Sequence, residues 1–180
     1  MANEFNIKNG FIATTDSRII GGLTANTISA TTITLGSNIT MLNRPAFSVY
    51  GSGTTNSLTT TQNGTGTLNT NNFALSYSQG AGFDISTGVF TAPIAGLYHV
   101  TLIGRNSGYA SGISQLAVIK NDSNNSGNVM MIEWASSSSM NHAGGGQIFK
   151  LAVNETLRLK VLAGQITFDG NDNWSVAYIG

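Results

Sequence analysis

The side chains that could carry acid–base chemistry are few in this sequence. Among 180 residues there are two histidines and eight carboxylates. A serine hydrolase needs a serine, a histidine and an acid held in a fixed arrangement, and the G-x-S-x-G turn that presents the nucleophile in one large class of these enzymes is absent. We therefore expect a protein that is not an enzyme. The alternative is an enzyme such as a polysaccharide depolymerase. The acids it could use are Asp84, Glu133, Asp169 and Asp172.

The two histidines lie in different kinds of sequence. His99 alternates with the apolar residues Tyr98 and Val100, so we expect it to face solvent or a neighbouring subunit. His142 follows a run of serines and precedes three glycines, which is typical of a solvated loop. Neither position indicates a catalytic role.

One segment has the character of a metal site, the sequence DGNDN at residues 169–173. Oxygen ligands at alternating positions are typical of calcium loops, which makes Asp169, Asn171 and Asp172 candidate ligands. The segment lacks a following glycine and a later bidentate glutamate. A polar hairpin explains the same residues, and we favour it. We expect no cofactor, and calcium is the one metal worth testing.

Three aromatic residues could stack on a sugar ring. They are Tyr109, Trp134 and Trp174. Large aromatic side chains in β proteins are more often core or interface anchors, and that is the favoured interpretation of both tryptophans. Tyr109 lies in the loop-like sequence RNSGYASG and is expected to be exposed. We retain Tyr109 and Trp134 as candidate receptor contacts.

Composition excludes several classes of partner. Charged residues make up 9% of the chain and the net charge is +0, against roughly 25% charged residues in ordinary soluble domains. Basic patches for nucleic acid or acidic membranes are therefore not expected. There are no cysteines, no apolar run approaches the roughly 20 residues that span a bilayer, and the first ten residues, MANEFNIKNG, do not resemble a signal peptide. We expect no nucleic-acid partner, no membrane insertion and synthesis in a cytoplasm.

Short apolar runs separated by polar turns recur through the second part of the chain. In residues 155–163 the leucines and Val161 alternate with Arg158 and Lys160, and no window has a clear 3.6-residue period. This pattern predicts an all-β sandwich. The strands we expect are residues 46–50, 98–104, 115–120, 128–135, 147–153, 155–163 and 173–179.

The segment FDISTGVFTAPIAGLYHV, residues 83–100, predicts a corner that leads into a core strand. Thr87 and Gly88 indicate a turn, and Pro93 ends the ladder of a strand or lies at its edge. Gly96 allows a tight approach of the backbone. Tyr98 begins a series of inward-facing residues in the long strand that follows.

This order of elements resembles the globular head of complement component 1q, a relative of the tumour necrosis factor jelly rolls. The resemblance is carried by AFSV at 46–49, by residues 83–100, by VIKND at 118–122, by GGGQIFKLAVNETLRLKV at 144–161 and by FDGNDNWSVAYIG at 168–180. It implies a ten-stranded jelly-roll β-sandwich that forms a trimer, in which three copies complete one another's core. The fold and trimer-core residues it implies are Phe47, Phe83, Phe90, Pro93, Gly96 and Tyr98.

The chain also departs from that family. Ala92 stands where many relatives have cysteine, and no collagen-like Gly-X-Y stalk precedes the head. A Thr- and Ile-rich segment takes its place, which looks like phage fibre and decoration proteins that carry such heads on β-structured stems. The missing collagen makes a role in immune recognition unexpected.

We therefore expect two parts, an extended β-rich stem or anchor at residues 1–42 and the jelly-roll head at residues 43–180. The first part has too few apolar residues to fold alone, so it must pair with other copies or dock on a partner; a flexible tail is the alternative. The residues we expect to anchor it to a particle are Phe5, Ile7, Phe11 and Ile12.

The leading hypothesis is a non-enzymatic homotrimeric structural protein in the virion of a tailed phage, either a short tail fibre or a capsid decoration (cement) projection with its head outward. Its partners would be other capsid or tail proteins, together with a host surface glycan or receptor in the case of a fibre. The alternative is a soluble lectin-like carbohydrate-binding module, for which residues 1–42 would be dispensable.

Overall fold

The structure is a computed structural model that describes residues 44–52, 57–59, 73–106, 112–123, 125–135 and 141–180. All of them belong to one unit of the chain, Thr40–Gly180. The predicted anchor at residues 1–42, with Phe5, Ile7, Phe11 and Ile12, lies outside the described residues. The boundary between stem and head therefore stays a prediction.

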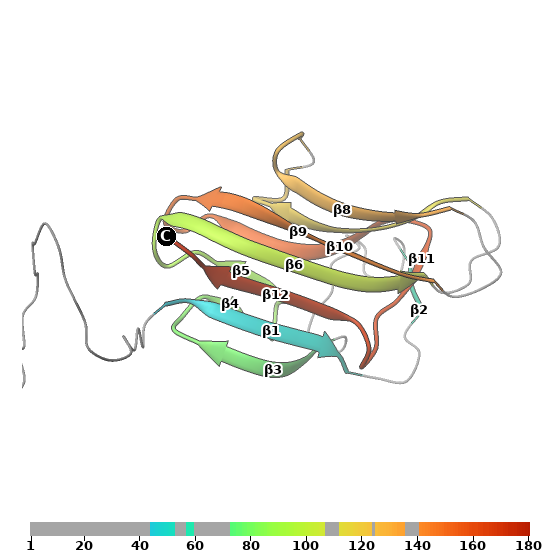
Figure 1. Cartoon of the computed structure of the whole chain (residues 1–180), viewed down its shortest axis with the longest axis horizontal. Helices are drawn as coiled ribbons and strands as arrows, with labels where there is room; N and C mark the ends of the chain where they lie inside the picture. Colours follow the sequence, from blue (N-terminus) through green and yellow to red (C-terminus); the bar gives the residue numbers. More distant parts are fainter. Residues whose placement is uncertain (1–43, 53–56, 60–72, 107–111, 124, 136–140) are drawn as a thin grey trace, which may run out of the picture. The chain divides into compact units, whose positions relative to one another are not determined.

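Two antiparallel sheets make up the described part of the chain (Figure 1). The five main strands of the first sheet follow the order β9–β6–β12–β1–β3, and two short strands, β11 and β2, extend it beside the end of β6. The bounds are β9 (His142–Leu151), β6 (Gly96–Asn106), β12 (Asn173–Tyr178), β1 (Ala46–Gly51), β3 (Phe73–Gln79), β11 (Gln165–Thr167) and β2 (Ser57–Thr59).

The second sheet has the order β4–β5–β10–β7–β8. Its strands are β4 (Phe83–Asp84), β5 (Val89–Thr91), β10 (Thr156–Ala163), β7 (Ser114–Lys120) and β8 (Val129–Trp134). The described residues include no helix, and so none that could cross a membrane. The predicted all-β sandwich is confirmed. It has twelve strands in the described residues instead of the expected ten, and the short strands β2 and β11 pair with each other.

The core lies between the two sheets and is closed within one chain. Phe47, Phe90 and Tyr98 are only 2%, 1% and 0% exposed. Phe83 stacks on Phe47 with ring centroids 3.9 Å apart, and the edge of the Trp174 ring meets Phe47 at 4.8 Å. The expectation that copies complete one another's core is therefore corrected for Phe47, Phe90 and Tyr98, because these side chains have almost no surface left to share.

Alternation along the strands matches the predicted pattern. Leu157, Leu159 and Val161 are buried, whereas Arg158 and Lys160 are turned outward and both reach Asp122. The same alternation runs along β6 and β12, whose inward residues belong to the core. A strand with a period of two residues has one face in the core, and the sequence between the buried positions defines the other face.

The predicted corner is confirmed. Gly88 has φ 67° and closes the turn between β4 and β5 by donating its N–H to the Asp84 carbonyl at 2.8 Å. Pro93 follows the end of β5. At Gly96, with φ 154°, a Cβ atom would lie 2.5 Å from the carbonyl oxygen of Gly180. Glycine is required there because β6 begins directly against the end of the chain.

Candidate assembly face

The outer face of the first sheet is built from residues that alternate with the core positions. Its central row crosses four strands: Ser48 on β1 is paired with Ser175 on β12, Ser175 with Thr101 on β6, and Thr101 with Gly146 on β9. All four residues are small and uncharged. This row forms the middle of what we term the assembly face.

One further row of paired residues lies on each side of the central row. The pairing of β1, β12, β6 and β9 defines both of these rows. We define the assembly face as these three rows: Ser48, Ser175, Thr101 and Gly146; Ala46, Ala177, His99 and Ile148; Tyr50, Asn173, Ile103 and Gly144. It includes no Asp, Glu, Lys or Arg. A surface of twelve residues without a formal charge is unusual, because strand faces in contact with water normally carry charged side chains.

The side chains of Ser48, Thr101, Ser175 and Asn173 on this face already have hydrogen-bond partners within the chain. Thr101 Oγ1 and Ser175 Oγ share a short hydrogen bond. Asn173 Nδ2 donates to Ser48 Oγ at 2.8 Å and to the Val49 carbonyl at 3.1 Å. A buried polar group is costly only when it is left unpaired, so these groups could be covered by another surface at little cost.

Apolar side chains at the edges of the face remain exposed. Ile148, Ile103 and Tyr50 are 55%, 45% and 39% exposed. The small central row leaves the backbone accessible to a close neighbour, and at Gly146 a Cβ would already lie 3.2 Å from His99 Nε2. Depletion of charged residues and exposed apolar side chains are both typical of protein–protein contacts. The arrangement therefore suits association with another protein surface.

The second sheet presents a different outer surface. Lys160 Nζ lies 2.6 Å from Asp122 Oδ1, and Arg158 Nε lies 3.3 Å from the same oxygen. Gln115 Nε2 donates to Glu133 Oε2 at 2.6 Å. These charged and amide groups favour contact with water, so the two outer faces differ in kind.

The four candidate catalytic acids have structural partners. Asp84 accepts hydrogen bonds from Ser86 N and Oγ at 2.8 and 2.6 Å, which hold the pKa of Asp84 below its usual value. Glu133 bonds Gln115, as described above. Asp169 forms an ion pair with Arg105. His99, as expected, is exposed, and it belongs to the assembly face.

Asp172 is the most buried of these carboxylates, with 1% of its surface exposed. Its Oδ2 accepts the Asp169 N–H at 2.7 Å, whereas Oδ1 is buried without a hydrogen bond. Arg105 and His142 both approach it to 3.9 Å. Burial raises the pKa of Asp172 to about 6, although Arg105 and His142 act in the opposite direction.

The candidate calcium ligands are brought together by a turn. The backbone N–H of Asn171 donates to Asp169 Oδ1 at 3.0 Å, and that of Asp172 donates to the Asp169 carbonyl at 2.9 Å. The Asp169 carboxylate is further occupied by Arg105. A cation would have to displace this guanidinium, so the favoured alternative, a polar turn ahead of β12, describes the segment better. The described residues contain no cluster of His, Cys, Asp and Glu able to hold a metal ion.

The candidate sugar-stacking residues are not assembled into a platform. Trp134 is 6% exposed and Trp174 is 0% exposed, and both belong to the hydrophobic core. The proposed receptor contact at Trp134 is corrected accordingly, since its ring has almost no surface accessible to a ligand. Tyr109 lies outside the described residues, so its exposure stays a prediction.

Comparison with known proteins shows the fold. No protein-family model matches the sequence, and no curated protein matches it. The globular domain of zebrafish complement 1qA protein is 18% identical, with 75% of this chain and 96% of that chain covered at a TM-score of 0.54. Eiger TNF from S. frugiperda is 9% identical, with 77% of this chain and 94% of that chain covered at a TM-score of 0.59. Murine APRIL is 8% identical, with 76% of this chain and 100% of that chain covered at a TM-score of 0.54. The chain therefore has a complement 1q/tumour necrosis factor-like jelly-roll fold.

The raised pKa of Asp172 predicts how stability depends on pH. Its native pKa of about 6 exceeds the usual 3.8, so between these values the folded chain binds more protons than the unfolded chain. The stability that this group contributes is present below about pH 4 and lost as the pH rises through 6. Relative to Asp172→Asn, the wild-type free energy of unfolding should fall by up to about 3 kcal/mol between pH 4 and 7, as measured by urea unfolding.

The matched control is Asp84→Asn, an exposed carboxylate whose pKa is lowered. Its contribution should have the opposite sign and be lost as the pH falls. If Asp172→Asn and the wild type had parallel pH profiles, the assignment of a raised pKa to Asp172 would be wrong.

Proposed function

We propose, on the premise of a complement 1q/tumour necrosis factor-like jelly-roll fold, that this chain is a non-enzymatic homotrimeric structural protein of a tailed-phage virion. It serves as a short tail fibre or as a capsid decoration (cement) projection. Residues 1–42 attach it to the particle, and the head projects outward.

The assembly face is the observation that carries the trimer. The core of each protomer is closed, so association does not have to complete the fold. What remains is an uncharged surface on which Ser48, Thr101, Ser175 and Asn173 are hydrogen-bonded within the chain and Ile103 and Ile148 are exposed. Identical copies related by rotation can cover such surfaces mutually, and the resemblance to complement 1q heads implies three of them.

Attachment to a particle is supported by the sequence ahead of the head. Residues 1–42 are rich in Thr, Ile and Asn and carry the apolar cluster Phe5, Ile7, Phe11 and Ile12. This segment occupies the place that a collagen stalk has in complement proteins. A low content of charge and an absence of cysteine also suit a particle component that is made in the cytoplasm and released by lysis.

The non-enzymatic role is supported by the placement of the acids. Asp84, Glu133 and Asp169 each bond a neighbouring side chain, and Asp172 is buried. A soluble lectin is disfavoured because Trp134 and Trp174 are both in the core. A host receptor for a fibre would therefore be bound through other residues, such as Tyr109.

A pair of matched substitutions tests the trimer. Both variants add one carboxylate to each protomer: Ile148→Glu places it on the assembly face, whereas Met131→Glu places it on the outer face of the second sheet, where Met131 is 46% exposed. We expect the wild type and Met131→Glu to have three times the 18.8 kDa mass of one chain in light scattering. Ile148→Glu should lower the association constant at least about tenfold, because burying charge is costly, with an unchanged circular dichroism spectrum. Equal masses for both variants would contradict the assignment of this face.

Removal of residues 1–42 tests attachment. Because the described core closes without them, the shortened chain should fold, form trimers and fail to enter particles, as measured by mass spectrometry of purified virions. A full-length variant with Phe5, Ile7, Phe11 and Ile12 all replaced by serine should show the same loss. Normal incorporation of either variant would count against the anchor, and a wild-type chain absent from virions would contradict the proposed function.

A further inference from the structure

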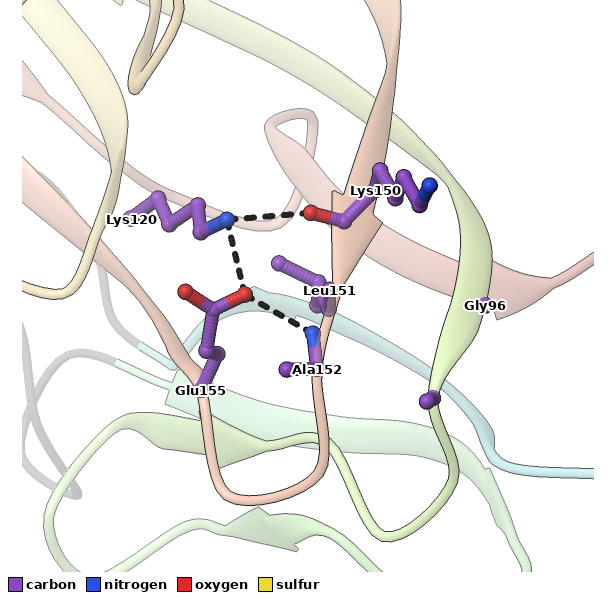
Figure 2. Close-up of a pocket in the computed structure, with 7 residues that line it drawn as sticks. Gly96, Lys120, Lys150, Leu151, Ala152 and Glu155 are labelled. Carbon is purple, nitrogen blue, oxygen red and sulfur yellow. Dashed lines mark hydrogen bonds and ion pairs between the residues drawn. The ribbon is translucent and has the colours of Figure 1, made fainter.

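An open pocket of about 460 Å³ lies at the end of the head where β6 begins and β9 ends (Figure 2). We term this the basal end, because β1 also begins there and the chain enters the fold at Arg44. The pocket is formed between the β5–β6 corner and the β9–β10 turn. Its apolar wall is Ala95, Leu151 and Ala152, and its charged wall is Lys120, Lys150 and Glu155.

Two of the three charged groups are fully engaged within the chain. Lys120 Nζ contacts Glu155 Oε2 at 2.7 Å and donates to the Lys150 carbonyl at 3.0 Å. Glu155 also accepts the Ala152 N–H at 2.8 Å and the Asn121 side-chain amide at 2.8 Å. The hydrogen bond from Lys120 contributes most to holding the pKa of Glu155 below its usual value. This carboxylate is therefore part of the wall and not a free anion.

Lys150 is the remaining charge. Figure 2 shows its side chain pointing away from Lys120 and Glu155. It is exposed, and within the described part of the chain it has no carboxylate partner. A lysine at the rim of a pocket, with its charge unmatched, is positioned to meet an anionic group from outside.

The two turns that form the pocket also present apolar side chains to solvent. Ile94 precedes the lining residue Ala95 and is 41% exposed, and Val153 follows the lining residue Ala152 and is 52% exposed. The turns are tied together, because Asn154 N–H donates to the Ala92 carbonyl and Ala92 N–H donates to the Glu155 carbonyl, both at 2.8 Å. Ile94 is held further by the Tyr98 hydroxyl, which donates to its carbonyl at 2.6 Å. The apolar rim is therefore fixed in advance of binding.

Charge is distributed unevenly along the head. Five of the six lysine and arginine residues in the described part of the chain lie at or reach the basal end, whereas three of its six carboxylates lie at the same levels of the strands. Of these three, Asp122 and Glu155 are paired with Lys160 and Lys120, and Asp84 accepts hydrogen bonds from Ser86. The basic residues are Arg44, Lys120, Lys150, Arg158 and Lys160. The basal end thus has a net positive charge in a chain whose total is +0.

We propose that this basal pocket is a docking site for an acidic segment of a partner protein, in which a carboxylate meets Lys150 and an adjacent apolar side chain enters between Ile94 and Val153. The charge complementarity and the apolar wall together favour a protein segment over a purely ionic ligand. This inference rests on the proposed function: the partner is the capsid or tail protein that carries the projection. Such a contact would add a second attachment point to that made by residues 1–42 and fix the direction of the head.

Binding of short peptides to the isotope-labelled full-length chain tests the proposal without particles. The peptides are Gly-Glu-Leu-Glu-Gly, Gly-Glu-Gly-Glu-Gly and Gly-Lys-Leu-Lys-Gly. Each is added in 50 mM NaCl while the amide chemical shifts of the protein are recorded. The first peptide should bind saturably and shift the amides of Ala95, Gly96 and Ala152. The second should bind at least about threefold more weakly because it lacks the apolar side chain, and the third should not bind.

The matched variants are Lys150→Gln and Ala135→Glu, which both lower the net charge by one, the latter at an exposed site next to β8 at the opposite end of the strands. Lys150→Gln should raise the dissociation constant about fivefold or more, and Ala135→Glu should leave it nearly unchanged. Equal weakening by both variants, or no saturable binding of the first peptide, would overturn the proposal. It would also be overturned if duplex DNA or phosphatidylglycerol vesicles bound the wild type more tightly than the first peptide. Since none of these measurements needs a virion, the proposed function and the docking site can fail separately.

Discussion

The register of β6 against β9 and β12 is the constraint on which the other features depend. Val100 and Leu102 face the core, so Thr101 and Ile103 must face outward, and the same holds for their partners on both neighbouring strands. A shift of one residue would exchange the two faces. It would place the Thr101 and Ser175 hydroxyls in the core and the aliphatic residues in water. Core burial therefore determines which residues form the assembly face.

The few charged residues are distributed unevenly, so the two ends of the head differ in charge. The assembly face has no formal charge, most cations lie at the basal end, and at the opposite end Arg105 is balanced by Asp169 and Asp172. Because the assembly face carries no formal charge, identical copies can approach one another there without charge repulsion. The remaining charges then distinguish the end where the chain enters the fold from the opposite end of the strands. This arrangement is consistent with a projection that is attached at one end.

The sequence predicted the elements that are defined by a pattern of neighbouring residues. Alternation of apolar and polar residues located β10 and β12, and Gly88, Pro93 and Gly96 located the corner. The sequence did not reveal β3, because Phe73 is the only buried residue of that edge strand. Trp134 was ambiguous, since one aromatic residue at the end of a strand can face the core or a ligand. The assembly face and the basal pocket could not be predicted, because their residues come from separate strands that only register and turn geometry bring together.

Hydroxyl-radical footprinting of the full-length chain at micromolar concentration tests the central claim most directly. Three isoleucines have similar exposure in one protomer: Ile103 and Ile148 on the assembly face, and Ile113, which precedes β7, outside it. If copies cover the face, Ile103 and Ile148 should be oxidised several-fold more slowly than Ile113. Equal oxidation of all three would show that the face is open to water and would contradict the account.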